Sequence, residues 1–156
     1  MIKPTGAERP AETPLEWGQL AGSVGPRLRL LHNVMVARSI AALDGSGLPT
    51  GSHTVLSLIA ANPGSTQTAL ADAAGLNKSA LVGIVDELEK RGFAERVRSP
   101  TDRRRNHLTV TPAGVTEMKA MFAKVSPTET KIREALGPRD HALLLELLDR
   151  AYAALD

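Results

Sequence analysis

The chain carries the segment Asp102-Arg103-Arg104-Arg105-Asn106-His107-Leu108-Thr109-Val110-Thr111-Pro112-Ala113-Gly114, in which a basic turn leads into a β-like run and then into a helix start. Just upstream, residues 93–98 alternate apolar and polar side chains as a half-buried strand does, and residues 99–102 are turn formers. Residues 107–110 supply the returning strand. Thr111-Pro112 is typical of an N-cap followed by the first helical position. The pattern predicts a β-hairpin with a basic tip, followed directly by a helix.

Positive charge is concentrated around this hairpin. Between Lys90 and His107 the chain holds seven Lys and Arg against two acidic residues, a net charge of +5, whereas the whole chain of 156 residues carries +2. An arginine triplet in a turn can be an ordinary solvated loop. Charge placed on one segment in this way is also typical of a surface that meets phosphate, and the elements before the hairpin favour that interpretation.

Two short helices are predicted immediately before the hairpin. The first can begin at Ser65 or Thr66 and ends at Gly75, and Asn77 caps the second. In the second helix, apolar residues recur at i, i+3, i+4 and i+7, namely Leu81, Ile84, Val85 and Leu88. Two short helices joined by a glycine turn form a helix-turn-helix, and the hairpin that follows is its wing.

Longer helices flank this unit. Residues 15–43 predict a long helix buried on more than one side, and a further helix, with Thr50 as N-cap, runs to residue 62. After the wing, Ser126-Pro127 is expected to kink or interrupt the helix that starts at Pro112, and a last helix is expected from Pro138. The first and last helices are each apolar over too much of their surface for a monomer, so a two-fold dimer is expected.

The predicted fold class is mainly α, since the hydrophobic content is 42% but the aromatic content only 3%. Four segments are expected. Residues 1–13 form a flexible N-terminal tail and residues 14–48 an N-terminal dimerisation helix. Residues 49–114 form a winged helix-turn-helix DNA-binding lobe, and residues 115–156 the C-terminal dimerisation helices.

Several function classes have no support in the sequence. The chain has no cysteine, and its four histidines have no metal-binding spacing. Phosphate-loop and nucleophile-elbow motifs are also missing, so we expect no enzyme activity, no metal and no cofactor. No apolar run approaches the length of a membrane span, and no signal peptide is visible. The expected location is the cytoplasm, without a membrane partner.

The order of elements over residues 15–155 resembles the MarR family of bacterial winged-helix regulators. Asp102-x-Arg104 with Leu108, Thr111 and Gly114 is similar to the wing signature of the family, and residues 88–96, Leu-Glu-Lys-Arg-Gly-Phe-Ala-Glu-Arg, are similar to its segment between recognition helix and wing. The chain departs from the pattern at Val110, where leucine is usual, and at Gly83, where relatives often carry arginine.

The resemblance implies a homodimeric transcriptional regulator, most often a repressor, that binds a pseudo-palindromic operator in double-stranded DNA. The recognition helix would enter the major groove through Asn77, Lys78, Ser79, Ala80 and Gly83. The wing would contribute Arg96, Arg98, Asp102, Arg103, Arg104 and Arg105, with Arg104 in the minor groove, held by Asp102, and its neighbours on phosphates. Thr66, Gln67 and Thr68 would bond phosphate at the start of the preceding helix.

Members of this family commonly release DNA when a small anionic, often aromatic, compound binds. Candidate contacts for such an organic acid, or for its coenzyme A thioester, are Arg27, Arg29, His32, Asn33, Arg38 and His53. These residues have an ordinary alternative as interface pairs or structural residues. Two other functions stay open: a winged-helix module that binds proteins, and a constitutive repressor without ligand. DNA affinity and its salt dependence distinguish the first, and ligand-induced thermal shifts distinguish the second.

Overall fold

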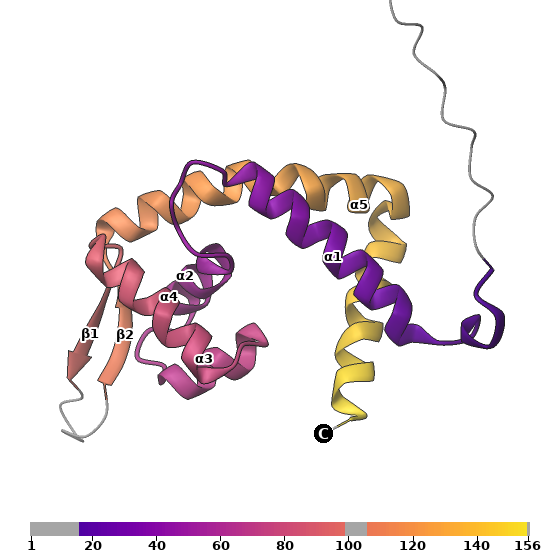
Figure 1. Ribbon diagram of the computed structural model, residues 1–156, viewed down its shortest axis with the longest axis horizontal. Helices are drawn as coiled ribbons and strands as arrows, with labels where there is room; N and C mark the ends of the chain where they lie inside the picture. Colours follow the sequence, from indigo (N-terminus) through magenta and orange to yellow (C-terminus); the bar gives the residue numbers. More distant parts are fainter. Residues whose placement is uncertain (1–15, 99–105, 156) are drawn as a thin grey trace, which may run out of the picture. The chain divides into compact units, whose positions relative to one another are not determined.

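The computed structural model describes residues 16–98 and 106–155. Its elements are a 3₁₀ turn Gly18–Leu20, α1 Val24–Ala42, α2 Ser52–Ala61, α3 Gln67–Ala74, α4 Lys78–Lys90, β1 Ala94–Arg98, β2 Asn106–Val110 and α5 Pro112–Ala153 (Figure 1). The predicted mainly α class is confirmed, with a single two-stranded sheet in the described part of the chain. The predicted tail, residues 1–13, lies outside the described residues.

The chain consists of two compact units, Met1–Val34 and Met35–Asp156, and the boundary between them lies inside α1. The described part of the first unit contains the 3₁₀ turn and the first half of α1. Here Arg27 donates to the carbonyl oxygen of Ser23 at 2.7 Å and lies over the ring of Trp17, 4.9 Å from its centroid. The long helix predicted from residue 15 therefore begins later than expected, because the chain makes a separate turn before Val24.

In the second unit, α2 is surrounded by the other elements and carries the centre of the core. Val55, Leu56 and Ile59 of this helix are fully buried. They pack in one cluster with residues of α3, α4, the hairpin and α5, among them Leu70, Leu81, Val85, Leu88, Leu108 and Met121. The predicted apolar face of α4 is confirmed, since its four residues at helical spacing are all buried. This core fixes the positions of α3, α4 and the hairpin relative to one another.

The hairpin is antiparallel, with Ala94 opposite Val110 and Arg98 opposite Asn106. Its second strand also pairs with the segment before α3. The backbone N–H of Gly64 donates to the carbonyl oxygen of Leu108 at 3.3 Å, and the N–H of Leu108 donates back to Ser65 at 3.4 Å. The predicted hairpin is confirmed, and the middle of its second strand is joined to the segment before α3 by these backbone bonds.

Three local predictions differ from the structure. α2 begins at Ser52, and its N-cap is Gly51 rather than Thr50, because Gly51 has a left-handed φ of 91° that an α-helix cannot contain. α5 is not interrupted at Ser126-Pro127, where the backbone stays helical. Its break lies at Gly137, with φ 73° and ψ 166°, so the predicted helix start at Pro138 is confirmed. None of the described helices is long and apolar enough to cross a membrane.

Candidate nucleic-acid interface

The two helices of the helix-turn-helix are set by side-chain caps and a left-handed glycine. Thr66 accepts a 3.2 Å hydrogen bond from the N–H of Ala69, which starts α3, and Gly75, with φ 63°, ends that helix. Asn77 starts α4 through a 2.8 Å bond from the N–H of Ala80. Each cap satisfies a backbone donor that has no partner within its helix. The predicted caps are confirmed, and α3 leads through a short turn into α4.

The first turn of α4 is presented to solvent. The five residues predicted for the major groove are all exposed: Asn77, Lys78, Ser79, Ala80 and Gly83. The hydroxyl of Ser79 donates to the Asn77 carbonyl oxygen at 2.7 Å, so the side chains of these two residues hold each other in place. At the start of α3, Thr68 is exposed, and Thr66 and Gln67 are half-buried. This surface offers Lys78 as a cation and few other groups that can hydrogen-bond base edges.

The structure gives Arg96 a position that the sequence did not predict. Its guanidinium lies between two carboxylates of α4, with a 2.7 Å hydrogen bond to Asp86 and an ion pair to Glu89. Its backbone N–H also donates to Glu89 at 2.8 Å. Two acidic partners pair with this arginine, which the sequence placed among the DNA-binding residues. Through these contacts Arg96 ties β1 to α4, and thereby constrains the angle between the hairpin and this helix.

A second arginine, Arg91, connects the end of α4 to the loop between α1 and α2. Its guanidinium donates 2.7 Å hydrogen bonds to the carbonyl oxygens of Ser46 and Gly47, and its Nε donates to Glu87 at 2.8 Å. The hydrogen bond from Arg91 lowers the pKa of Glu87 below its ordinary value, and Lys90 adds to this effect. Sequence reasoning counted Arg91 only as positive charge. The i,i+4 spacing of Glu87 and Arg91 was the one available signal of a paired side chain.

The basic tip of the wing lies outside the described residues. This applies to four predicted contacts, Asp102, Arg103, Arg104 and Arg105. Arg98 is described through its backbone, which pairs with Asn106 at the end of the hairpin. The described part of the hairpin therefore ends at residues 98 and 106.

The predicted ligand contacts belong to both units. Arg27, Arg29, His32 and Asn33 are exposed residues of the first unit, and Arg38 is an exposed residue of the second. His53 of α2 is half-buried, with its ring 6.0 Å from that of Phe122 in α5. Burial lowers the pKa of His53, and its Nε2 is buried without a hydrogen-bond partner among the described residues. Its buried position therefore favours the neutral form of this histidine over the charged one.

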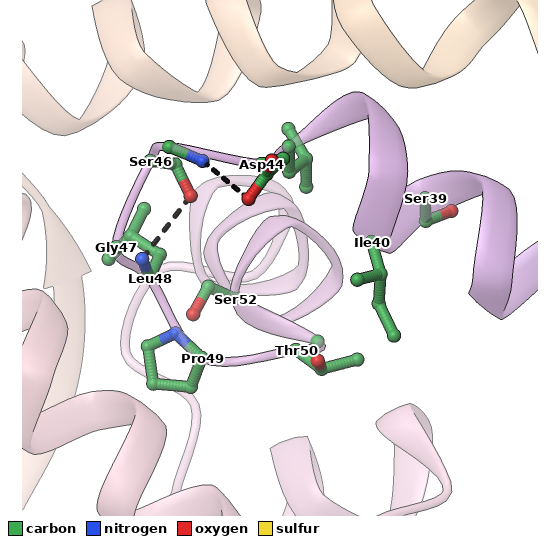
Figure 2. A pocket seen from close by; sticks show the side chains of 12 residues that line it. Ser39, Ile40, Asp44, Ser46, Gly47, Leu48, Pro49, Thr50 and Ser52 are labelled. Carbon is green, nitrogen blue, oxygen red and sulfur yellow. Dashed lines mark hydrogen bonds between the residues drawn. The ribbon is translucent and has the colours of Figure 1, made fainter.

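Two pockets lie in the second unit. One, of about 490 Å³, is formed by α2 and α5, and its lining residues are Ser57, Ala60, Ala61, Met118, Lys119 and Phe122. The other, of about 340 Å³, lies where α1 meets α2 and is lined by Ser39, Ile40 and residues 43–52 (Figure 2). Within residues 16–98 and 106–155, no group of three or more His, Asp or Glu side chains is arranged to hold a metal ion.

Comparisons with known proteins agree with this architecture. The sequence model of the MarR family matches residues 46–105. The chain is 35% identical over 138 residues to a protein of Thauera aromatica that is named as a transcriptional regulatory protein for the hcr operon, and the match covers 86% of this chain and 82% of the relative.

The chain belongs to the MarR family. It is a transcriptional regulator that binds DNA. The solved structure of the transcriptional repressor CouR, bound to a 23-mer DNA duplex, is 30% identical, with a TM-score of 0.75 over 90% of this chain and 99% of that chain. A MarR-family regulator from Silicibacter pomeroyi has the same fold, with 19% identity and a TM-score of 0.79 over 91% of this chain and 97% of its own.

Proposed function

We propose that this MarR-family chain is a homodimeric repressor that binds a pseudo-palindromic operator and is released by a small organic acid or its coenzyme A thioester. The observation that carries the DNA-binding part is the exposed first turn of α4, on a helix whose later turns are bonded to the first strand of the hairpin through Asp86 and Glu89. The similarity to CouR, a repressor solved on a DNA duplex, supports this arrangement. The family consists of regulators rather than enzymes, which agrees with the expected lack of catalysis.

The proposed contacts follow the two grooves of DNA. Asn77, Lys78 and Ser79 approach base edges in the major groove, and Ala80 and Gly83 let the backbone of α4 come close. With few polar groups on this surface, much of the specificity comes from groove shape. Arg104, oriented by Asp102, inserts into the minor groove, while Arg98, Arg103 and Arg105 meet phosphates together with Thr66, Gln67 and Thr68.

Exposed apolar side chains support a dimer. The described part of the first unit exposes Trp17, Leu20, Val24, Leu28, Leu30, Leu31 and Val34, and the second half of α5 exposes Leu143, Leu145, Leu147 and Tyr152. Apolar surface of this extent favours contact with a second copy. Sedimentation equilibrium should give twice the 16.6 kDa of one chain, and Leu147→Glu should reduce the mass to that of a monomer.

The pocket between α2 and α5 suits an aromatic acid. Phe122 and Met118 offer apolar and aromatic surface, and Lys119 supplies a positive charge that pairs with a carboxylate. The ring of His53, a predicted ligand contact, lies 6.0 Å from the ring of Phe122, so an aromatic ligand in this pocket would lie close to His53. The volume of this pocket, about 490 Å³, lies in the range of small-molecule sites.

The DNA-binding proposal is tested by fluorescence anisotropy on DNA from upstream of the protein's own gene and on a scrambled duplex, at about 50 and 200 mM salt. Wild type should prefer its own upstream DNA, and Arg104→Ala should weaken binding by at least about tenfold, because the minor-groove contact is lost. Arg150→Ala, at the far end of α5, is the control and should bind as wild type does. Failure of wild type to bind either duplex would instead favour the protein-binding module.

The effector proposal is tested by adding benzoate and 4-hydroxybenzoate to the protein–DNA complex. Release of DNA by either acid, lost in Lys119→Gln and kept in Lys124→Gln, is the expected result. Both lysines are exposed residues of α5, but only Lys119 lines the pocket. A complex that withstands a broad panel of aromatic acids and their coenzyme A thioesters would identify a constitutive repressor.

A further inference from the structure

The pocket between the end of α1 and the start of α2 is lined by a negatively charged side chain and by no positively charged one. It encloses about 340 Å³, and its lining consists of Ser39, Ile40 and residues 43–52, all within the described part of the chain. These residues include the carboxylate of Asp44 but no Lys, Arg or His. Ile40, Leu43, Leu48 and Pro49 provide its apolar wall. An anionic ligand would therefore meet the Asp44 carboxylate without a cation among the lining side chains, since the Arg91 guanidinium is bonded to the carbonyl oxygens of the pocket wall and lies outside the lining.

A buried hydroxyl lines the same pocket. Ser52 is 1% exposed, and its Oγ forms no hydrogen bond with any group in residues 16–98 or 106–155. Figure 2 shows this side chain on the inner side of the loop that carries Gly47, Leu48 and Pro49. A buried hydroxyl without a partner is costly, by about 1–3 kcal/mol, and such groups in native proteins usually meet a ligand or water. A ligand with its own hydroxyl or amine would provide the missing hydrogen bond.

The wall of this pocket is bonded to the recognition helix. Ser46 and Gly47 line the pocket, and their carbonyl oxygens are the acceptors of the two 2.7 Å bonds from Arg91 at the end of α4. Gly47 has a φ of 65°, and a Cβ there would lie 2.9 Å from the Arg91 guanidinium, so the loop and the arginine fit closely. A ligand that displaces this loop must also disturb Arg91. Because Arg91 is bonded to Glu87 in the last turn of α4, this disturbance reaches the recognition helix.

We propose that this pocket is an effector site for a small neutral or cationic molecule that carries a hydroxyl or amine on an apolar body, and that Arg91 transmits its occupancy to α4. The proposal rests on the proposed function, since it assigns a second regulatory site to the same DNA-binding protein. Ser52 hydrogen-bonds the polar group of the ligand, Asp44 favours a cation over an anion, and the apolar wall packs against the ligand body. Occupancy moves the carbonyls of Ser46 and Gly47 away from Arg91 and weakens DNA binding.

Three probes that share one ring test the chemical class: benzyl alcohol, benzylamine and benzoate. Backbone amide shifts in two-dimensional NMR of the full chain should respond at Ser46, Gly47 and Ser52 to the alcohol and the amine, and much less to benzoate. Ser52→Ala should weaken the alcohol and the amine by about fivefold, because one hydrogen bond is lost. Asp44→Asn should weaken the amine while leaving the alcohol unchanged. Equal or tighter benzoate binding here, or no response to any probe, would overturn the proposed site.

The coupling is tested by the DNA affinity measured with and without benzylamine. Wild type should lose at least about fivefold in DNA affinity when the probe is bound. The Arg91→Ala protein should still show the NMR response to benzylamine, but benzylamine should no longer lower its DNA affinity. Lys90→Ala is the matched control. Lys90 is the exposed neighbour of Arg91, and in the described structure its side chain pairs only with Glu87, at 3.4 Å. Benzylamine should lower the DNA affinity of this variant as much as that of wild type.

The failures of the two proposals are distinguishable. If the unliganded protein does not bind DNA, the proposed function is wrong, while the NMR response still tests the pocket. If DNA binding is normal and the bound probe leaves it unchanged, the transmission through Arg91 is wrong. An Arg91→Ala protein that responds to benzylamine as wild type does would also contradict that transmission.

Discussion

The guanidinium of Arg96 in β1 donates a 2.7 Å hydrogen bond to the carboxylate of Asp86 in α4. Glu89, one turn further along α4, accepts from both the side chain and the backbone N–H of Arg96. The Arg96 side chain is only 23% exposed in this arrangement. In the proposed complex, with the wing in the minor groove and α4 in the major groove, the wing needs a fixed angle to that helix. The bonds from Arg96 to Asp86 and Glu89 hold the hairpin at one angle to α4.

Replacement of Arg96 should therefore affect folding as well as DNA binding. Arg96→Ala leaves two carboxylates without their cation, so we expect a loss of about 1–3 kcal/mol in the free energy of unfolding, measured by urea denaturation. Lys78→Ala is the comparison, since this exposed side chain at the start of α4 should change DNA affinity but not stability. If Arg96→Ala unfolds like wild type and only lowers the salt slope of DNA binding by about one, Arg96 acts as a phosphate contact.

Gly114 marks a point where the start of α5 touches the hairpin. A Cβ on this residue would collide with the carbonyl group of Phe93 and lie 2.8 Å from Cγ2 of Val110. The collision partner is backbone, which cannot rotate away as a side chain can. Gly114→Ala should therefore lower the free energy of unfolding by about 1–3 kcal/mol or more, as overpacking of a tight site does. A thermal melt with an unchanged midpoint would show that the α5 start can shift without cost.

Gly83 gives the opposite expectation on the exposed side of α4. A Cβ there meets no atom within 4 Å, and the residue is helical, so Gly83→Ala should raise stability by about 0.5–1 kcal/mol. If the backbone of α4 comes close to the bases, the added methyl group should at the same time weaken operator binding in anisotropy. A more stable variant with unchanged operator affinity would remove Gly83 from the proposed interface.

Local signals in the sequence were sufficient for α3, α4 and the hairpin. Thr66, Asn77 and Thr111 each accept a hydrogen bond from a backbone N–H three residues later, and this chemistry acts over one helical turn. The buried face of α4 follows from the 3.6-residue period. Predictions of this kind succeed because both partners lie close together in the chain.

The relationships that the sequence did not indicate join distant residues or depend on backbone angles. Arg91 bonds carbonyl oxygens 44 and 45 positions away, and a carbonyl group has no sequence signature. Pro127 was expected to disturb α5, but a proline fixes φ near the helical value, and the helix continues past it. Gly137, whose φ of 73° is outside the helical region, makes the break instead.

His53 should make the stability of the protein depend on pH below neutrality. Burial lowers the pKa of His53 from its ordinary value of 6.5, so below that pH the unfolded chain binds a proton more readily than the folded one. The contribution of His53 to the free energy of unfolding is complete above pH 6.5, and it is lost as the pH falls through the lower pKa of the folded state. Urea denaturation between pH 7.5 and 5 should show this loss in wild type and a smaller loss in His53→Gln. Identical pH dependence in His53→Gln and wild type would mean that the loss originates in other groups.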